Sequence, residues 1–500
     1  MFVLPFTLLI GCSDFFDVNK TPNNPLDVPL STILPSALVA TGFANANELN
    51  RFYSTVSDYL YGVAGGPSNY DTYVLTGGDF GNQWTGELWN GALIQYQRII
   101  EKGEADGSMA YVGIAKIMQA YTWSLVTDTW GDIPYSQALK GVEGITRPDV
   151  DLQEDIYKGN ASKEIKSLFD LTREGIAALG QPSTVSPGVD DVVYGGNLTN
   201  WRKAGYTLML RMAMTISAKE PAFAAGIINE VLAANGGNVN ATLISANNEN
   251  LAVKFGGVVG SQSPIYSYMF VTTFQNDMTV STRFLNLLED GANPDDPRLP
   301  LFLKKGVTTS GGTTPTAGYA TFDNGFRGTL PGTITFTKWN TAVTGANGVG
   351  PVRLATYAGR CFMLAEAILR IPGVNAGALT AQALYTEGMR ASMTDAGVAA
   401  ADITTYLASP RGTLSADPVT AQDQIITQKY IAMTGNGLDA WIDIRRTGFP
   451  SHTQPEHLNA AGEDGKRPVR ARYPDSDIAR NQKLGDVVKK TNEKVWWDAN

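Results

Sequence analysis

Two carboxylates lie close together between Leu125 and Tyr135, where Asp128 and Asp132 flank Trp130. Such a pair can hydrolyse a glycosidic bond, because one carboxyl group can donate a proton while the other acts as base or nucleophile. The same residues can also be structural, since a Gly-Asp-Ile-Pro turn can satisfy the carbonyl groups at a helix end while the tryptophan fills the core. We favour the structural interpretation and predict no catalytic residue.

Histidine and cysteine, which supply most nucleophilic and metal-binding sites, are scarce. The chain has two of each, and His452 and His457 lie in a Pro/Gly/polar stretch near the C-terminus. No His/Cys cluster has the spacing of metal ligands. A Ser-His-Asp or Cys-His mechanism would depend on one of those two histidines. We therefore predict no His- or Cys-based catalytic site, no cofactor and no metal site, although the sequence does not address a structural ion in a loop.

The composition describes a folded, mildly acidic protein. Apolar residues make up 43% and aromatic residues 10%, while 39 Lys and Arg against 48 Asp and Glu give a net charge of −9. No run of Lys or Arg could grip a phosphate backbone, so nucleic acid is excluded as a partner.

The first ten residues are almost wholly apolar and resemble the core of a signal peptide, and they are too short to span a bilayer. The sequence Leu9-Ile10-Gly11-Cys12 resembles a bacterial lipobox, although no Lys or Arg precedes the apolar run. We predict a signal peptide over residues 1–11, an acylated Cys12 and a flexible, proline-bearing leader over residues 12–30. The alternative is a chance cysteine beside a buried start.

The segment before the two acids has the period of a buried helix. Its apolar residues step by four, three, four and four, at Ala110, Ile114, Ile117, Tyr121 and Leu125. Similar spacing predicts helices from Ser31 onward, through Leu88 to a cap at Gly103, over 159–179, 198–218, 221–234 and 421–433, and from Leu438.

An apolar stripe from Leu354 to Ile368 predicts another helix, within which Glu366 can pair with Arg370. Thr380 can cap the next helix, whose small residues allow close approach. The two helices form a hairpin about the size of one tetratricopeptide unit. Because Cys361 lies within the stripe, we expect a buried free thiol.

Residues 235–350 differ from the rest, since much of this stretch is rich in Gly, Thr, Asn and Ser and punctuated by aromatic residues. Only Thr333–Trp339 alternates like a strand. Long irregular insertions tend to carry function, because loops present binding surface on a rigid scaffold. The sequence thus predicts a mainly α fold of helical hairpins with little β, forming one domain over residues 31–500 with loop-rich insertions at about 235–350.

Taken together, the motifs resemble the SusD/RagB family of outer-membrane nutrient-binding lipoproteins. Besides the lipobox, the matching stretches are Thr127–Ser136, Asp296–Leu299, Leu364–Ala367, Gln428–Tyr430, Ala440–Gly448, Arg472–Pro474 and Trp496–Asp498. Each is weak alone, but their order spans nearly the whole chain.

The resemblance implies tetratricopeptide-like hairpins and a binding protein rather than an enzyme. It implies a lipid-anchored protein at the outer membrane that captures oligosaccharides or peptides. The partner it implies is a TonB-dependent transporter of the SusC/RagA type. Ligand residues of the family lie in variable loops, so only the acylated Cys12 carries over by motif.

Sugar rings offer flat C–H faces on which aromatic side chains can stack while polar groups take the hydroxyls. On this basis the candidate ligand residues are Tyr70, Tyr73 and Trp84, before the second helix, and Phe336 and Trp339 in the insertion. The alternative for each is that the ring packs its loop onto the body.

Two other functions remain open. A surface glycoside hydrolase would need two catalytic carboxylates that the sequence does not locate. A helical-repeat scaffold for protein partners would need no small-ligand site.

Overall fold

The computed structural model describes residues 28–271, 273–289, 294–308, 316–330, 335–453 and 456–500. The predicted signal peptide, Cys12 and all but the last residues of the predicted leader lie outside these ranges.

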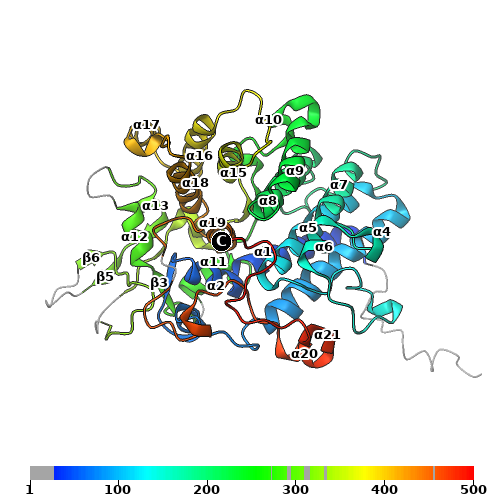
Figure 1. Ribbon diagram of the computed structural model, residues 1–500, viewed down its shortest axis with the longest axis horizontal. Coiled ribbons are helices and arrows are strands. Elements are labelled where there is room, and N and C mark those ends of the chain that lie inside the picture. The colour runs from blue at the N-terminus through cyan, green and yellow to red at the C-terminus, as the bar shows by residue number, and fades with distance from the viewer. Residues whose placement is uncertain (1–27, 272, 290–293, 309–315, 331–334, 454–455) are drawn as a thin grey trace, which may run out of the picture.

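Helices form most of the described chain (Figure 1). The first group is α1 (Leu30–Ala46), α2 (Glu48–Val56), α3 (Gly65–Asp71), η2 (Gln83–Leu93), α4 (Ile94–Asp106), α5 (Met109–Trp130), α6 (Gln153–Lys158), α7 (Leu168–Ala178), α8 (Leu198–Ile216), α9 (Pro221–Ala233) and α10 (Val239–Thr242). The insertion holds α11 (Pro264–Tyr266), η7 (Ser267–Val271), α12 (Thr282–Leu288), α13 (Leu299–Phe302) and α14 (Thr341–Thr344). The last group is α15 (Tyr357–Arg370), α16 (Ala381–Ala396), α17 (Ala400–Leu407), α18 (Pro418–Ala432), α19 (Gly437–Thr447), α20 (Asp475–Arg480) and α21 (Gln482–Gly485).

The strands of the described residues are short and pair two by two, always antiparallel. The pairs are β1 (Leu60–Gly62) with β3 (Met278–Val280), β2 (Leu251–Val253) with β8 (Val352–Ala355), β4 (Leu303–Lys304) with β7 (Lys338–Trp339), and β5 (Gly306–Thr308) with β6 (Thr316–Gly318). The prediction of a mainly α fold with little β is confirmed. Of the strand predicted over residues 333–339, residues 333 and 334 lie outside the described ranges. In the described part, β7 covers Lys338–Trp339 and Thr335 makes an isolated bridge with Val307.

Successive helices pack as hairpins, and glycines set the closest approaches. At Gly113 on α5, an added Cβ would lie 2.8 Å from the carbonyl oxygen of Gly175 on α7. At Gly388 on α16, it would lie 2.8 Å from the ring of Phe362 on α15. The predicted hairpin of α15 and α16 is confirmed, and the Thr380 hydroxyl accepts a hydrogen bond from the amide of Ala383 at its start.

Two predicted helix boundaries are wrong for local reasons. The helix from Ser31 divides at Asn47 into α1 and α2, and Leu60 belongs to strand β1. The helix expected to end at Gly103 continues to Asp106 and is closed by Gly107, which adopts a φ of +77°. Gly103 serves packing instead, because an added Cβ would lie 2.7 Å from the Val112 side chain on α5.

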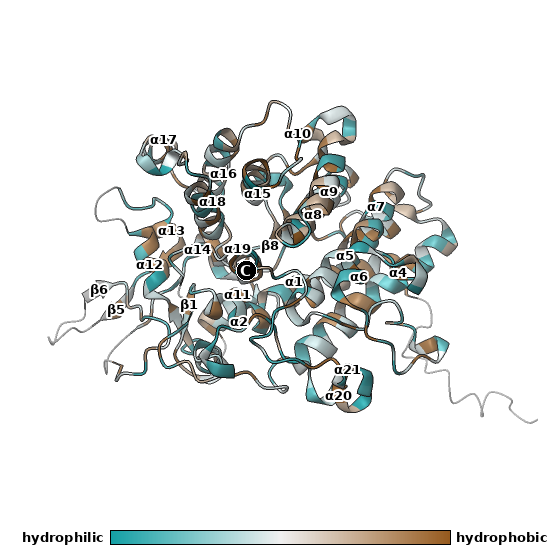
Figure 2. Cartoon of the chain, in the orientation of Figure 1, coloured by the Kyte–Doolittle hydropathy of each residue, from teal (hydrophilic) through white to brown (hydrophobic). Residues whose placement is uncertain are grey.

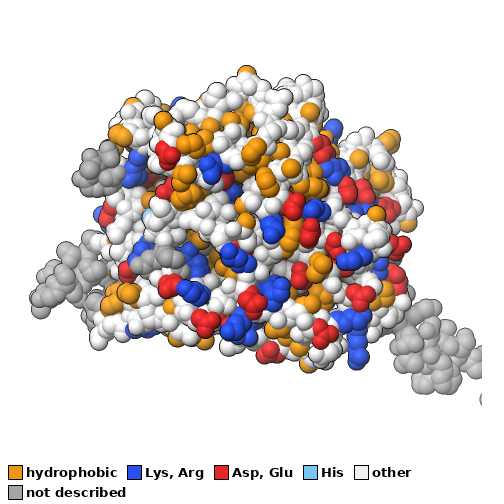
Figure 3. Space-filling view, in the orientation of Figure 1, with side chains coloured by type: hydrophobic (Ala, Val, Ile, Leu, Met, Phe, Trp, Pro, Cys, Tyr) orange, Lys and Arg blue, Asp and Glu red, His pale blue; other side chains and the backbone are white. Residues whose placement is uncertain are grey.

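Apolar side chains from α1 to Trp497 form a continuous buried cluster. Figure 2 shows brown and teal residues alternating along the helices, and the peripheral α20 and α21 are mostly teal. Cys361 lies in this interior as a free thiol, as predicted, and burial raises its pKa to about 11. On the face seen in Figure 3, basic and acidic side chains are interspersed. None of the helices in the described ranges is long and apolar enough to cross a bilayer.

Buried charges join the last group of helices. Arg446 on α19 pairs with both Glu366 on α15, at 2.6 Å, and Asp443, at 2.7 Å, while Lys429 on α18 lies 2.8 Å from Asp443. Burial opposes the charge on Arg446, but the two carboxylates outweigh it and raise its pKa. The predicted pairing of Glu366 with Arg370 is wrong, because Glu366 faces the interior while Arg370 lies at the exposed end of the helix.

Replacing Glu366 with Ala should lower the free energy of unfolding by about 3–5 kcal/mol, because Arg446 loses a carboxylate that it cannot replace with water. Urea unfolding measures the change. The matched control is Glu154→Ala, which removes a surface pair with Lys158 and should cost about 0–1 kcal/mol. Equal effects of the two variants would contradict a structural role for the buried pair.

Candidate ligand-binding face

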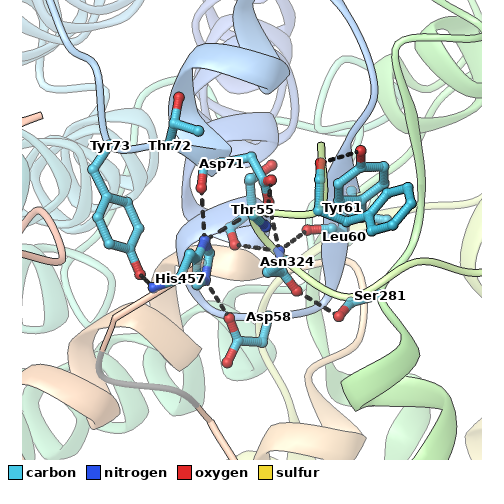
Figure 4. A network of polar contacts seen from close by, with 12 residues as sticks. Thr55, Asp58, Leu60, Tyr61, Asp71, Thr72, Tyr73, Ser281, Asn324 and His457 are labelled. Carbon is cyan, nitrogen blue, oxygen red and sulfur yellow. Dashed lines mark hydrogen bonds and ion pairs between the residues drawn. The ribbon is translucent and has the colours of Figure 1, made fainter. Parts of the chain in front are cut away.

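A buried polar network joins the start of the chain, the insertion and the C-terminal segment (Figure 4). The His457 ring lies between two acidic residues, with Nε2 2.6 Å from Asp58 Oδ1 and Nδ1 2.9 Å from the main-chain oxygen of Asp71. A carbonyl oxygen only accepts, so Nδ1 must carry a hydrogen. The second hydrogen bond, between Nε2 and the Asp58 carboxylate, then fixes the orientation of the ring.

The Asp71 side chain extends this network to the insertion. Asn324 donates to Asp71 Oδ1 at 2.8 Å and to the carbonyl oxygen of Leu60 at 2.9 Å, and the Gly325 amide donates to Asp71 Oδ2 at 2.7 Å. The Ser281 hydroxyl donates a hydrogen bond to the amide oxygen of Asn324. Burial raises the pKa of Asp71, and His457 with these donors opposes that rise. The loop around Asn324 is therefore fixed although it has no regular structure.

The network positions a group of aromatic rings that we call the insertion face, formed by Tyr61, Phe322 and Phe326. The two phenylalanines are half-buried and stack at 5.5 Å, and the buried Tyr61 ring lies 5.6 Å from Phe322. The Tyr61 hydroxyl donates to the carbonyl oxygen of Phe326 at 2.8 Å. Half-exposed rings held by buried contacts can stack on a ligand without first losing freedom.

Charged groups of both signs border the insertion face. Arg327 is exposed, and its guanidinium donates to the main-chain oxygens of Phe326, at 2.7 Å, and Ser68, at 2.9 Å. Arg283 pairs with Asp323 at 2.9 Å. Rings with guanidinium and carboxylate groups at their edge suit a ligand that combines apolar faces with hydroxyl groups.

The structure buries all five predicted ligand residues, and their role in binding stays a prediction. The exposed fractions are 2% for Tyr70, 0% for Tyr73, 3% for Trp84, 9% for Phe336 and 1% for Trp339. Each side chain therefore packs a loop or helix onto the body, which was the alternative interpretation.

The two tyrosines are buried because the glycine-rich segment folds back as α3. Tyr70 packs between Phe52 and Phe80, and its hydroxyl donates to Glu48 at 2.7 Å. Tyr73 lies against His457, whose main-chain amide donates to the tyrosine hydroxyl at 3.0 Å.

The other three rings also support neighbouring rings. Trp84 stacks under Trp89 at 4.0 Å, and Trp339 packs edge-on against Phe284 at 5.6 Å. Phe336 lies edge-on to Phe322 of the insertion face at 6.4 Å. Phe336 is thus the predicted residue whose ring contacts that face.

Sequence reasoning missed Tyr61, Phe322 and Phe326 as a group. Both phenylalanines belong to the aromatic residues that punctuate the insertion, but nothing local distinguishes them from buried neighbours. The one available signal was the polar Asn324-Gly325 pair between them, which marks a tight loop.

The two acids near Trp130 are structural, as favoured from the sequence. Asp128 is buried at the end of α5 and accepts hydrogen bonds from Tyr157, at 2.7 Å, and Trp497, at 2.9 Å. Burial raises its pKa. The Asp132 carboxylate accepts from the Gln153 amide at 2.8 Å. Within the described ranges, no three His, Cys, Asp or Glu side chains are placed to hold a metal ion.

A protein-family model described as SusD-like, starch-binding associating with outer membrane, matches residues 22–474. No curated protein sequence matches the chain significantly.

Solved structures share the fold over nearly their whole length. A SusD homolog from Bacteroides uniformis superposes with a TM-score of 0.72 at 22% identity, covering 94% of this chain and 99% of that one. A chitin-binding SusD homolog from Flavobacterium johnsoniae gives 0.72 at 22% identity, over 93% and 99%. A SusD-like protein of Bacteroidetes AC2a gives 0.75 at 20% identity, over 95% and 100%. At these identities the likeness establishes the fold.

Replacing Asn324 with Ala should lower the free energy of unfolding by about 1–3 kcal/mol, because Asp71 and the Leu60 carbonyl lose a buried donor. It should also speed amide hydrogen exchange in residues 322–326. The control Asn459→Ala removes one part-buried hydrogen bond to Gly325 and should cost about 1 kcal/mol or less. Unchanged exchange in Asn324→Ala would show that the network does not hold the insertion face.

Proposed function

The chain belongs to the SusD-like family, which associates with the outer membrane, and from this premise we propose that it captures glycans at the cell surface. The observation that carries the choice of a glycan is the half-buried Phe322–Phe326 stack beside Tyr61, bordered by charged groups. Such rings offer apolar area to the C–H faces of a sugar, while the charged groups take its hydroxyls. A chitin-binding relative supports the same ligand class.

The protein binds without altering its ligand. The acids that first suggested hydrolysis support this, because Asp128 is enclosed by Tyr157 and Trp497 and the Asp132 carboxylate accepts a main-chain amide. Hydrolysis needs one carboxyl group to donate a proton and a second to act on the opposite side of the bond. Release of shorter sugars from a glycan incubated with the pure protein would contradict the proposal.

We further propose that residues 1–11 are a signal peptide, that acylated Cys12 and the leader over residues 12–30 tether the body over residues 31–500, and that a SusC/RagA-like TonB-dependent transporter receives the ligand. The lipobox at Leu9–Cys12 and the family membership support this arrangement.

Replacing Phe326 with Ala should weaken glycan binding at the insertion face by about tenfold, because a stacking ring is lost while the main-chain acceptor for Tyr61 remains. Titration calorimetry with maltoheptaose and chitohexaose measures the affinity. The control is Phe43→Ala, which removes an exposed phenyl ring on α1. Raising the salt from about 0.1 M to about 1 M should change the affinity little, since a neutral glycan carries no charge whose attraction salt could screen. Full affinity in Phe326→Ala would place the glycan elsewhere.

Replacing Cys12 with Ser should move the protein from the membrane fraction to the soluble fraction, because the acyl chains are its anchor. Cell fractionation measures this shift. Affinity capture of the wild-type protein from detergent-solubilised membranes identifies the partner transporter. The control Cys361→Ser changes the buried thiol and should leave the protein in the membrane fraction. Membrane retention of Cys12→Ser would refute the anchor, and capture without a TonB-dependent barrel would refute the partner.

A further inference from the structure

A cavity of about 240 Å³ lies where η2 meets α20 and α21. Figure 1 shows α20 and α21 at the lower edge of the molecule, away from strands β5 and β6 of the insertion. Its walls include Trp84 and Trp89 from η2, Pro134 from the turn after α5, and Asn481 between α20 and α21. Enclosed ligand pockets usually exceed roughly 300 Å³, so this one suits a single ring of a longer ligand whose remainder lies outside.

The floor of this Trp89 cavity is a stack of two indole rings. Trp84 and Trp89 lie five positions apart, and in an α-helix such side chains point about 140° away from each other. In η2 the hydrogen bonds run from i to i+5, and this wider turn brings the rings together at 4.0 Å and 20°. Trp84 is buried and braced edge-on by Trp130, at 5.0 Å, and Tyr473, at 6.0 Å.

Trp89 is the half-buried member of the stack and offers its ring to the cavity. Because Trp84 supports it from below, Trp89 is ordered before any ligand arrives. A π-type turn of this kind is rare and is frequently found at functional sites.

Asn481 contributes a buried amide to the wall. The Asn481 side chain is 92% buried, since its exposed fraction is 8%, and its Nδ2 donates to the carbonyl oxygen of Pro148 at 2.9 Å. That bond fixes the amide, whose Oδ1 has almost no accessible surface. Asn481 therefore holds this part of the wall in place through Pro148.

The charged groups at the rim cancel. Asp477 and Arg480 both line the cavity, one able to accept and the other to donate. Neither an anion nor a cation would find complementary charge here. A neutral ring with hydroxyl donors and acceptors matches the rim charges and the stacked indole rings together.

We propose that the Trp89 cavity is a second glycan-binding site, which holds one neutral pyranose unit against Trp89 with its hydroxyl groups facing Asp477 and Arg480. This inference rests on the proposed function, in that it takes the ligand of the protein to be a glycan. It adds a site distant in sequence from the insertion and independent of Phe322 and Phe326.

Titration calorimetry on the full chain tests the proposal, with chitohexaose and maltoheptaose as probes and a detergent without a sugar head group. The wild type should bind two molecules of one probe, and Trp89→Ala should bind one, with affinity at the lost site reduced at least about tenfold. Phe326→Ala should also retain one site, through the Trp89 cavity. The matched control Trp496→Ala removes another half-buried indole, which lies against Tyr157, and should bind two.

Arg480→Ala provides a second variant that keeps the stack, because its side chain is exposed, and it should weaken binding at the same site several-fold. Unchanged stoichiometry and affinity in Trp89→Ala would overturn the second site while leaving the proposed function intact. No binding of either probe by the wild type would overturn both. Loss of binding in Trp89→Ala with none lost in Phe326→Ala would support the Trp89 cavity and refute the insertion face.

Discussion

The buried guanidinium of Arg446 is the constraint on which the helical body depends. A charge in the interior is tolerated only when every hydrogen-bonding group around it is matched, so Glu366 and Asp443 must meet it at hydrogen-bond distance. Through Lys429 the same cluster reaches α18. Apolar packing alone would let helices slide by a fraction of an ångström, whereas this cluster sets how α15, α18 and α19 lie together.

A body fixed in this way can carry binding residues on irregular chain. The loop around Asn324 has no helix or strand of its own, yet it is held by Asp71 at the end of α3 and, through His457, by the C-terminal segment. Each anchor is buried, so the hydrogen bonds face little competition from water. Buried hydrogen bonds behind a binding surface hold the side chains that face the ligand in place. The rings of the insertion face can therefore be half-exposed and still ordered.

The sequence predicts well those helices and caps that follow from local residue spacing. The stripe from Ala110 to Leu125 and the hairpin capped at Thr380 are local patterns, and both are found where expected. Partners distant in the chain are not local. Glu366 was matched with a neighbour one turn away, but its partner lies 80 positions on. Tyr70 is a candidate ligand residue in the sequence, whereas in the structure distant Phe52 and Phe80 lie against its ring.

The same limit explains why the sequence does not predict the stacking of Trp89. At 3.6 residues per turn, the side chains of Trp84 and Trp89 would point away from each other. Only a wider turn stacks positions five apart. The turn after α5 also contributes to the Trp89 cavity. Asp128 accepts hydrogen bonds from Tyr157 and Trp497, and Asp132 accepts one from a main-chain amide. These bonds fix the turn in which Pro134 forms part of the wall of the Trp89 cavity. The acids shape a binding site without touching what it binds.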